Sequence, residues 1–301
     1  MYWIIEWICF LVGTYHLLQL VRFLHSVILT LRSKQNPSVY GKGAWALITG
    51  ATDGIGKGFA RELARNGFNI ILVSRTAQKL RDTAQELQAE FKVDTQEVEA
   101  DFGKCTINPI NFFTAIHDQV KDKDIAVLVN NVGTAKPGFL CDLSVDALLQ
   151  TNALNLWPIA MLSRLIIPSM LKRPQKGLIM NLGSVASTMP GPGGAAYCAG
   201  KAFDLHLSNI MGMELSMEEK QNAGIDVMCL KPGYVDTPLT KNVEGKTGEI
   251  SADECVRCAL RIAGALPFTN GHWKHILMET AIPYLVAIML LTNSVPRPKV
   301  D

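Results

Sequence analysis

Apolar runs alternate with helix-forming segments between residues 43 and 280, at a period of about thirty residues, as βαβ units require. The runs are almost continuously apolar, which is typical of parallel strands that helices cover on both faces. The predicted strands are Ala44–Thr49, Phe68–Ser74, Gln96–Ala100, Ile125–Asn130, Gly177–Leu182, Ile225–Leu230 and Trp273–Met278. The pattern therefore predicts one α/β domain over residues 43–280, built on a doubly wound, Rossmann-like parallel sheet.

The stretch before this domain is unusually hydrophobic: residues 7–30 are mostly Leu, Ile, Val and Phe, with a few polar interruptions. A membrane-spanning helix needs about 20 predominantly apolar residues, so residues 1–35 are predicted to form a membrane anchor. A single span, an amphipathic helix in the membrane plane and a buried helix all remain open. Arg32, Lys34 and Lys42 follow the stretch, and cationic flanks favour the cytosolic side, so we expect the following domain in the cytosol.

A second apolar run, Ala281–Leu291, lies near the other end of the chain and contains Pro283. It is too short to cross a membrane. Residues 281–301 are therefore predicted to be an apolar segment and tail outside the domain. A membrane-facing flap, a dimer surface and a lid over an apolar substrate are all compatible with the sequence.

Composition narrows the classes of protein. Hydrophobic residues make up 48% of the chain and charged residues 19%, which excludes a disordered chain. The net charge is +2 and no long basic run occurs, so no nucleic-acid partner is expected. The seven cysteines are dispersed and are expected to be free thiols. Cys255 and Cys258 form a C-x-x-C pair without a second pair at zinc spacing, so no metal site is predicted.

A glycine-rich turn follows the first predicted strand and precedes a helix. Glycines in such a turn let a pyrophosphate approach the helix N-terminus, where free N–H groups and the helix dipole favour an anion. A tight turn with close packing is the alternative. The candidate cofactor-binding residues here are Gly50, Thr52, Asp53, Gly54, Ile55 and Gly56.

The end of the second predicted strand distinguishes the two dinucleotides. Enzymes that use NAD usually place an acidic residue there to hold the ribose hydroxyls. This chain has Ser74 and Arg75 instead, with no carboxylate until Asp82. A guanidinium is suited to a 2′-phosphate, so we predict NADP(H), although a solvated arginine would give the same sequence.

The candidate catalytic residues lie in the second half of the domain. Tyr197 and Lys201 are four residues apart, so on a helix they share a face. A phenol ordinarily releases its proton only near pH 10, and a nearby cation favours the ionised form. Ser184 follows the predicted strand Gly177–Leu182, at the sheet edge where such folds bind ligands.

Together these motifs resemble the short-chain dehydrogenase/reductase family across almost all of residues 43–280. The matching pieces are Thr49–Gly56, the Asn130-Asn131-Val132-Gly133 stretch, Asn152, Ser184, Tyr197 with Lys201, and Pro232-Gly233 with Thr237. Two departures are visible: Val132 where alanine is commoner, and Gly183 where a second serine often stands. Neither departure removes a reacting group.

The resemblance implies a role for each matching residue. Tyr197 would protonate a carbonyl oxygen, Ser184 would orient that oxygen, and Lys201 would favour ionisation of the phenol and hold the nicotinamide ribose. Asn152 would support a water that relays protons to Lys201. The further contacts to the cofactor implied by the family are Asp101 to adenine, and Asn131, Val132, Gly133, Pro232, Gly233, Val235 and Thr237 along the dinucleotide.

Within the family, the sequence most resembles membrane enzymes of the endoplasmic reticulum that reduce very-long-chain 3-oxoacyl-CoA or 17-ketosteroids. This implies reduction of the 3-keto group of an acyl-CoA in fatty-acid elongation, with a steroid 17-keto reductase and a membrane-bound scaffold without turnover as alternatives. The glycine-rich stretch Gly233–Ile250 could be a lid, and Lys231, Lys241 and Lys246 could meet a coenzyme A phosphate. The resemblance also implies a homodimer that packs Leu143–Leu171 and Ala196–Ser216 across a twofold axis.

Overall fold

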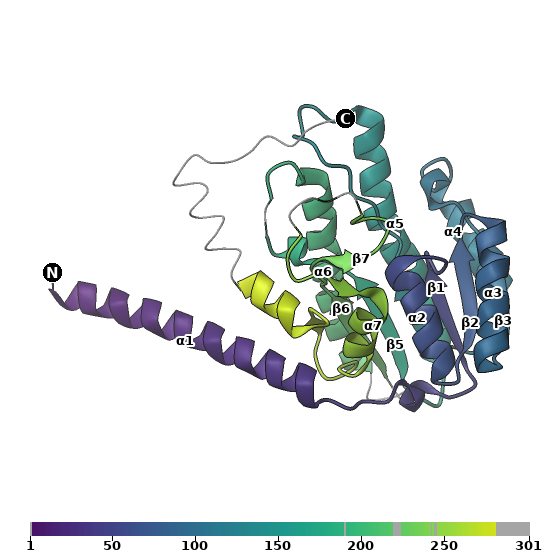
Figure 1. Ribbon diagram of the computed structural model, residues 1–301, viewed down its shortest axis with the longest axis horizontal. Coiled ribbons are helices and arrows are strands. Elements are labelled where there is room, and N and C mark those ends of the chain that lie inside the picture. Colours follow the sequence, from purple (N-terminus) through teal and green to yellow (C-terminus); the bar gives the residue numbers. More distant parts are fainter. Residues whose placement is uncertain (1, 190, 219–223, 242, 244–245, 281–301) are drawn as a thin grey trace.

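A parallel sheet of seven strands forms the centre of the protein, in the order β3-β2-β1-β4-β5-β6-β9. The structure is a computed structural model that describes residues 2–189, 191–218, 224–241, 243 and 246–280. The strands are β1 (Trp45–Thr49), β2 (Asn69–Ser74), β3 (Thr95–Glu99), β4 (Ile125–Asn130), β5 (Gly177–Leu182), β6 (Ile225–Leu230) and β9 (Phe268–Thr269). The predicted doubly wound α/β fold is confirmed (Figure 1).

Helices cover both faces of the sheet. One face carries α2 (Gly54–Arg65), α3 (Ala77–Phe91) and α7 (Ala252–Leu260), and the other carries α4 (Pro109–Val120), α5 (Val145–Met170) and α6 (Ala195–Glu218). Successive strand residues point to opposite faces: Ile48 packs with α2 and α7, whereas Leu47 packs with α4 and α5.

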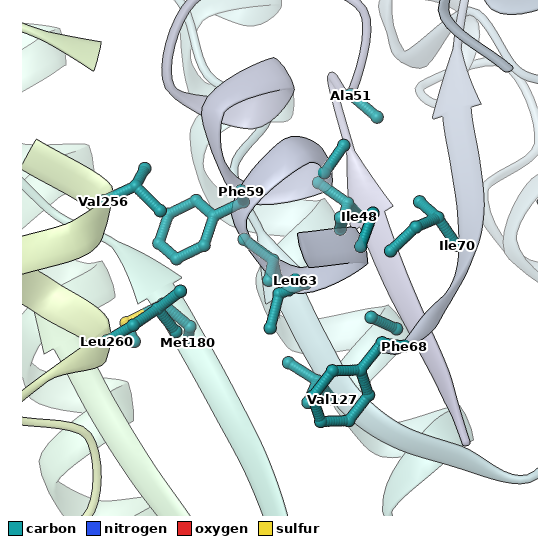
Figure 2. Close-up of a cluster of buried hydrophobic side chains, with 14 of the residues drawn as sticks. Ile48, Ala51, Phe59, Leu63, Phe68, Ile70, Val127, Met180, Val256 and Leu260 are labelled. Carbon is teal, nitrogen blue, oxygen red and sulfur yellow. The ribbon is translucent and has the colours of Figure 1, made fainter. Parts of the chain in front are cut away.

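Helix α2 is held on the sheet by its apolar face. Phe59 and Leu63 are completely buried, and Figure 2 shows them between Ile48 of β1 and Val256 of α7. Burying a side chain of this size contributes about 1.5–3 kcal/mol. Asp53 caps the helix by accepting a hydrogen bond from the N–H of Gly54 at 3.0 Å. Packing and cap together fix the first turn of α2 over the end of β1.

The last strand of the sheet is not where the sequence predicts it. The predicted strand Trp273–Met278 is wrong, because residues 273–280 are helical and β9 ends earlier, at Thr269. His272, His275 and Ile276 are buried while Trp273 and Leu277 are exposed. Burial spaced by three and four residues is the pattern of a helix, not the alternation of a strand.

The chain enters the domain from a long N-terminal helix, α1 (Tyr2–Arg32), which extends away from the sheet (Figure 1). Apolar side chains are exposed along its whole length, Trp7 and Leu31 among them. Among the described residues, one helix is long and apolar enough to cross a membrane by composition, namely α5, which packs against the sheet. The predicted segment 281–301 lies outside the described residues.

Short elements complete the fold. The 3-10 helices are η1 (Pro37–Tyr40), η2 (Phe102–Lys104) and η3 (Val185–Ser187). Strands β7 (Val235–Asp236) and β8 (Ile250–Ser251) pair with each other, Val235 with Ile250. This pairing holds the two ends of the predicted lid, Gly233–Ile250, side by side.

Candidate active site

Many of the predicted site residues lie at or just after the carboxyl ends of parallel strands. The turn after Thr49 leaves β1, Ser74 ends β2, Asn131 follows β4, Ser184 follows β5, and Pro232 follows β6. Because all these strands are parallel, their carboxyl ends lie along one edge of the sheet. Strand order reverses between β1 and β4, and ligands of doubly wound folds bind outside such a switch point.

Hydrogen bonds tie the glycine turn to the end of β4. The Thr49 hydroxyl accepts hydrogen bonds from the N–H groups of Asn131 (2.9 Å) and Val132 (3.1 Å), and the Asn131 amide donates to the Thr49 carbonyl at 2.9 Å. Gly50 has φ of 63°, which favours glycine. A Cβ on Gly56 would lie 2.2 Å from the Gly50 carbonyl oxygen. The turn therefore packs closely against the first turn of α2. Turn and helix N-terminus together form a cradle whose free N–H groups suit a pyrophosphate.

A polar cluster lies beside this cradle, toward β2. The Thr52 hydroxyl is 2.9 Å from the Ser74 hydroxyl, and Lys79 pairs with Asp53 at 3.1 Å. Arg75 follows directly and is exposed. Asp101 accepts a hydrogen bond from the N–H of Gly103 and so starts η2 beyond β3. These groups therefore line the carboxyl edge of the sheet beside the cradle, where the family resemblance predicts the adenosine.

The loop after β6 closes the cradle from the other side. A Cβ on Gly54 would lie 2.9 Å from the Thr237 side chain, so the two loops nearly touch. The Pro232 carbonyl accepts a hydrogen bond from the N–H of Val185 at 3.0 Å. Gly233 adjoins the buried face of helix 273–280, since a Cβ there would lie 2.8 Å from the His275 ring. The loop thus links the nucleotide cradle to the turn that carries Ser184.

Two predicted cofactor residues place their side chains wholly or partly in the core. Val235 is buried in the core with Ile250, and Ile55 packs against the same core. Val235 would therefore meet a cofactor only through its backbone, whereas the side chain of Ile55 is only partly buried.

Tyr197 and Lys201 are brought together on α6, as the spacing predicts. The Lys201 amine lies 5.9 Å from the centre of the Tyr197 ring and donates a hydrogen bond to the Leu182 carbonyl at 2.6 Å. Lys201 is buried. Burial alone would lower the pKa of Lys201, but the carboxylate of Asp204 and the phenol of Tyr197 raise it above its ordinary value. Lys201 is therefore protonated near neutral pH and places a positive charge beside the phenol.

Ser184 is held ready to donate a hydrogen bond. Its oxygen accepts the N–H of Ala186 at 3.1 Å, while its own N–H bonds the Ser187 hydroxyl at 3.1 Å. Its hydroxyl hydrogen is then available for a ligand oxygen. Gly183 is required at this turn, because a Cβ would lie 2.7 Å from the Cys229 sulfur. This crowding explains why a second serine does not stand here.

The asparagine beside Lys201 is Asn155, not Asn152. A Cβ on Gly133 would lie 2.8 Å from the Asn155 side-chain oxygen and 3.2 Å from the Lys201 amine, so both side chains border Gly133. Asn155 also accepts the N–H of Thr134 at 3.1 Å. Asn152 is one turn earlier on α5 and half-buried. We therefore assign to Asn155 the place that the sequence analysis gave to Asn152.

Lys231 is unavailable to a coenzyme A phosphate, which corrects the sequence interpretation. It is only 2% exposed, and its amine pairs with Glu279 at 2.6 Å. The same carboxylate accepts hydrogen bonds from Thr188 at 2.6 Å and Asn270 at 2.5 Å. Lys246 pairs with Glu249 on the surface. Lys231 is therefore a structural residue that fixes helix 273–280 through Glu279.

Asp204 is a further site residue that the sequence analysis missed. Its carboxylate pairs with the Lys201 amine at 2.9 Å, and both side chains are buried. The available signal was the spacing of three residues after Lys201 on the same helix. Within the described ranges, no three His, Cys, Asp or Glu side chains gather closely enough to hold a metal ion.

A doubly wound sheet with a glycine-lined cradle and a Ser–Tyr–Lys set defines a nucleotide-dependent oxidoreductase. Residues 44–248 match the family model described as short chain dehydrogenase. The chain belongs to the short-chain dehydrogenase/reductase family.

Two curated relatives illustrate the range of the family. The chain is 35% identical to very-long-chain 3-oxoacyl-CoA reductase-B of Danio rerio, over 84% of this chain and 79% of the relative. It is 33% identical to the inactive hydroxysteroid dehydrogenase-like protein 1 of Homo sapiens, over 81% of this chain and 72% of the relative. Among solved structures it is similar to a short-chain dehydrogenase from Sphingobium yanoikuyae in complex with NADPH, with a TM-score of 0.68, 26% identity, and coverage of 86% of this chain and 98% of that one.

Proposed function

We propose that the protein is an NADPH-dependent reductase of the 3-keto group of long- and very-long-chain 3-oxoacyl-CoA. The observation that carries the proposal is the Tyr197–Lys201 pair with Ser184, at the carboxyl edge of the sheet beside the glycine-lined cradle. Relatives named very-long-chain 3-oxoacyl-CoA reductase, 32–35% identical over about four fifths of the chain, support the substrate class.

The nicotinamide cofactor supplies the hydride when it is bound, and the protein supplies the proton and the geometry. Ser184 donates a hydrogen bond to the carbonyl oxygen, and Tyr197 transfers its proton to that oxygen as charge develops. Lys201 stabilises the phenolate that remains. The cradle at the N-terminus of α2 suits the pyrophosphate, and Asn131 fixes the turn before it by a hydrogen bond to the Thr49 carbonyl.

We further propose that Arg75 selects NADP(H). An exposed guanidinium at the end of β2 can form charge-assisted hydrogen bonds with a 2′-phosphate, each contributing about 1.5–3 kcal/mol. Replacing Arg75 by Asp is expected to lower the ratio of kcat/KM for NADPH over NADH by about a hundredfold. Steady-state kinetics with both cofactors measure the ratio. The control is Arg81→Asp, which makes the same change at an exposed arginine one turn into α3. An unchanged ratio in Arg75→Asp would refute the assignment.

We also propose that α1 anchors the protein in the endoplasmic-reticulum membrane, with the catalytic domain facing the cytosol. Its 31 residues exceed the roughly 20 that a span needs. Leu17, Leu24 and Leu31, one heptad apart, are each about half exposed or more, so α1 presents an apolar face to its surroundings. Pairing of the α5 and α6 outer faces in a homodimer is supported by the exposed apolar side chains Trp157 and Met213.

Charges placed on α1 test the anchor. Leu17→Arg with Leu24→Arg is expected to release most of the protein from membranes, because each arginine costs about 2.5–3.5 kcal/mol in a spanning helix. Flotation of cell membranes on a density gradient measures the bound fraction. Ile107→Arg with Ile110→Arg adds the same charge on exposed apolar residues of the domain and should leave the bound fraction unchanged. Full retention of the Leu17/Leu24 variant would contradict the proposal.

The substrate is tested by the oxidation of NADPH in the presence of long-chain 3-oxoacyl-CoA, androstenedione and estrone. Reduction of the acyl-CoA alone supports the proposal, and reduction of the steroids alone favours the 17-keto reductase. A scaffold without turnover is the second candidate, since one relative is named inactive. Ser184, Tyr197 and Lys201 are all present here, which argues for turnover.

A further inference from the structure

A buried carboxylate lies directly behind the catalytic lysine. Asp204 is 3% exposed, and one of its oxygens is 2.9 Å from the Lys201 amine. Its other oxygen is buried and has no hydrogen-bond partner among the described residues. Burial raises the pKa of Asp204 to about 6, although Lys201 opposes this shift. Near neutral pH and above, the pair is therefore an ammonium next to a carboxylate.

A chain of buried hydrogen bonds fixes the position of Asp204. The Ser208 hydroxyl donates to the Asp204 carbonyl at 2.5 Å and accepts a hydrogen bond from the Asn181 amide at 3.0 Å. Asn181 in turn accepts from Asn130 at 2.8 Å, and Asn130 donates to Ser163 at 3.1 Å. The chain crosses from α6 through β5 and β4 to α5, so α6 cannot shift along the sheet without breaking it.

Two of the three N–H groups of the Lys201 amine donate hydrogen bonds to partners within the protein. Of its three N–H groups, one meets the Leu182 carbonyl and one meets Asp204, which leaves the third for the Tyr197 side of the site. The other titratable groups near this pair are Cys229 and Lys231. Burial raises the pKa of the Cys229 thiol to about 12, so this thiol stays neutral. Asp204 is thus the one anion beside Lys201 among these groups.

We propose that Asp204 is a positioning residue of the active site: it holds the Lys201 amine at the end of β5 and partly neutralises the cation that acts on Tyr197. The proposal rests on the reductase function above. An adjacent anion favours the protonated form of a titratable group. The Asp204 carboxylate therefore makes proton loss from the coupled Tyr197–Lys201 pair harder, whichever residue loses its proton first. Asp204 thereby keeps the phenol protonated, as carbonyl reduction requires.

The pH profile of reduction tests this role. In Asp204→Asn the alkaline limb of the kcat/KM profile is expected to move to lower pH by about one unit, because an adjacent charge in a buried site has an effect of this size. Asp204→Glu keeps the charge and should restore the limb toward the wild-type pH. Asp226→Asn removes a carboxylate paired with Lys176 at the opposite end of the sheet and should leave the limb in place. A limb that does not move in Asp204→Asn, with activity lowered equally at every pH, would overturn the proposal.

A second readout separates this proposal from the reductase function. Tyrosinate absorbance, taken as the difference between each protein and its Tyr197→Phe counterpart, reports ionisation of Tyr197 without turnover. It should appear at lower pH in Asp204→Asn than in the wild type, and an equal or higher pH would overturn the role of Asp204. A protein that reduces no carbonyl but shows this shift would refute the reductase function alone. Should the asparagine variant fail to fold, Asp204→Leu removes the same charge without leaving a buried polar group.

Discussion

Replacing Tyr197 by phenylalanine is expected to lower kcat for carbonyl reduction about a thousandfold. The change removes only the phenolic hydroxyl, and a positioned proton donor contributes about 10²–10⁴-fold to such reactions. NADPH binding should be retained, because Lys201 and the glycine cradle are unchanged. Stopped-flow reduction and NADPH fluorescence titration measure the two properties separately.

Tyr40→Phe is the matched control for this variant. Tyr40 is buried, and its hydroxyl donates a hydrogen bond to Asp226 at 2.8 Å, far from the site along β6. Its loss should lower the free energy of unfolding by about 1–3 kcal/mol and leave kcat per folded molecule unchanged. If Tyr197→Phe lowered kcat less than tenfold, another group would have to supply the proton.

Replacing Gly56 by alanine is expected to abolish measurable NADPH binding, with an affinity loss of a hundredfold or more. The added Cβ would lie 2.2 Å from the Gly50 carbonyl oxygen and 2.5 Å from the Asn131 amide, so the backbone of the turn must move. Overpacking of this kind typically costs about 1–3 kcal/mol, and here the displaced atoms form the pyrophosphate cradle. Isothermal titration with NADPH and thermal unfolding measure the two consequences.

Gly212→Ala controls for the change of glycine to alanine in a helix. A Cβ there would meet Val227 at 3.6 Å, an ordinary contact, so this variant should bind NADPH normally and gain about 0.5–1 kcal/mol in stability. Normal NADPH affinity in Gly56→Ala would show that the cofactor does not use this cradle.

Strands in the middle of the sheet were predictable, whereas the last element was not. Strands β4, β5 and β6 occur with the bounds predicted from their apolar runs, because each run is buried on both faces and ends at polar or glycine residues. In the segment around Ile276, the order of apolar and polar residues is compatible with the repeat of a helix and with the alternation of a strand. Its helix is decided by contacts with Gly233 and Lys231, which are distant in sequence.

Within the site, sequence motifs located the reacting groups but not their supports. Tyr197, Lys201 and Ser184 belong to motifs with fixed spacing, and the structure brings Tyr197 and Lys201 together on α6. Asn152 and Asn155 lie on the same helix three residues apart, and only packing against Gly133 shows which of them reaches Lys201. An aspartate on a helix is usually solvated, so the sequence does not show that Asp204 is buried. It is buried because α6 packs against β5 and β6.

The carboxylate of Glu279 also connects helix 273–280 to the rest of the domain. It joins three segments, through Lys231 after β6, Thr188 after η3 and Asn270 after β9. Thr188 lies four residues after Ser184. Its hydrogen bond to Glu279 therefore places the end of helix 273–280 beside the turn that carries Ser184. Loss of the Glu279 carboxylate would therefore loosen the turn that carries Ser184 together with helix 273–280, although Glu279 is 95 residues away from that serine in the sequence.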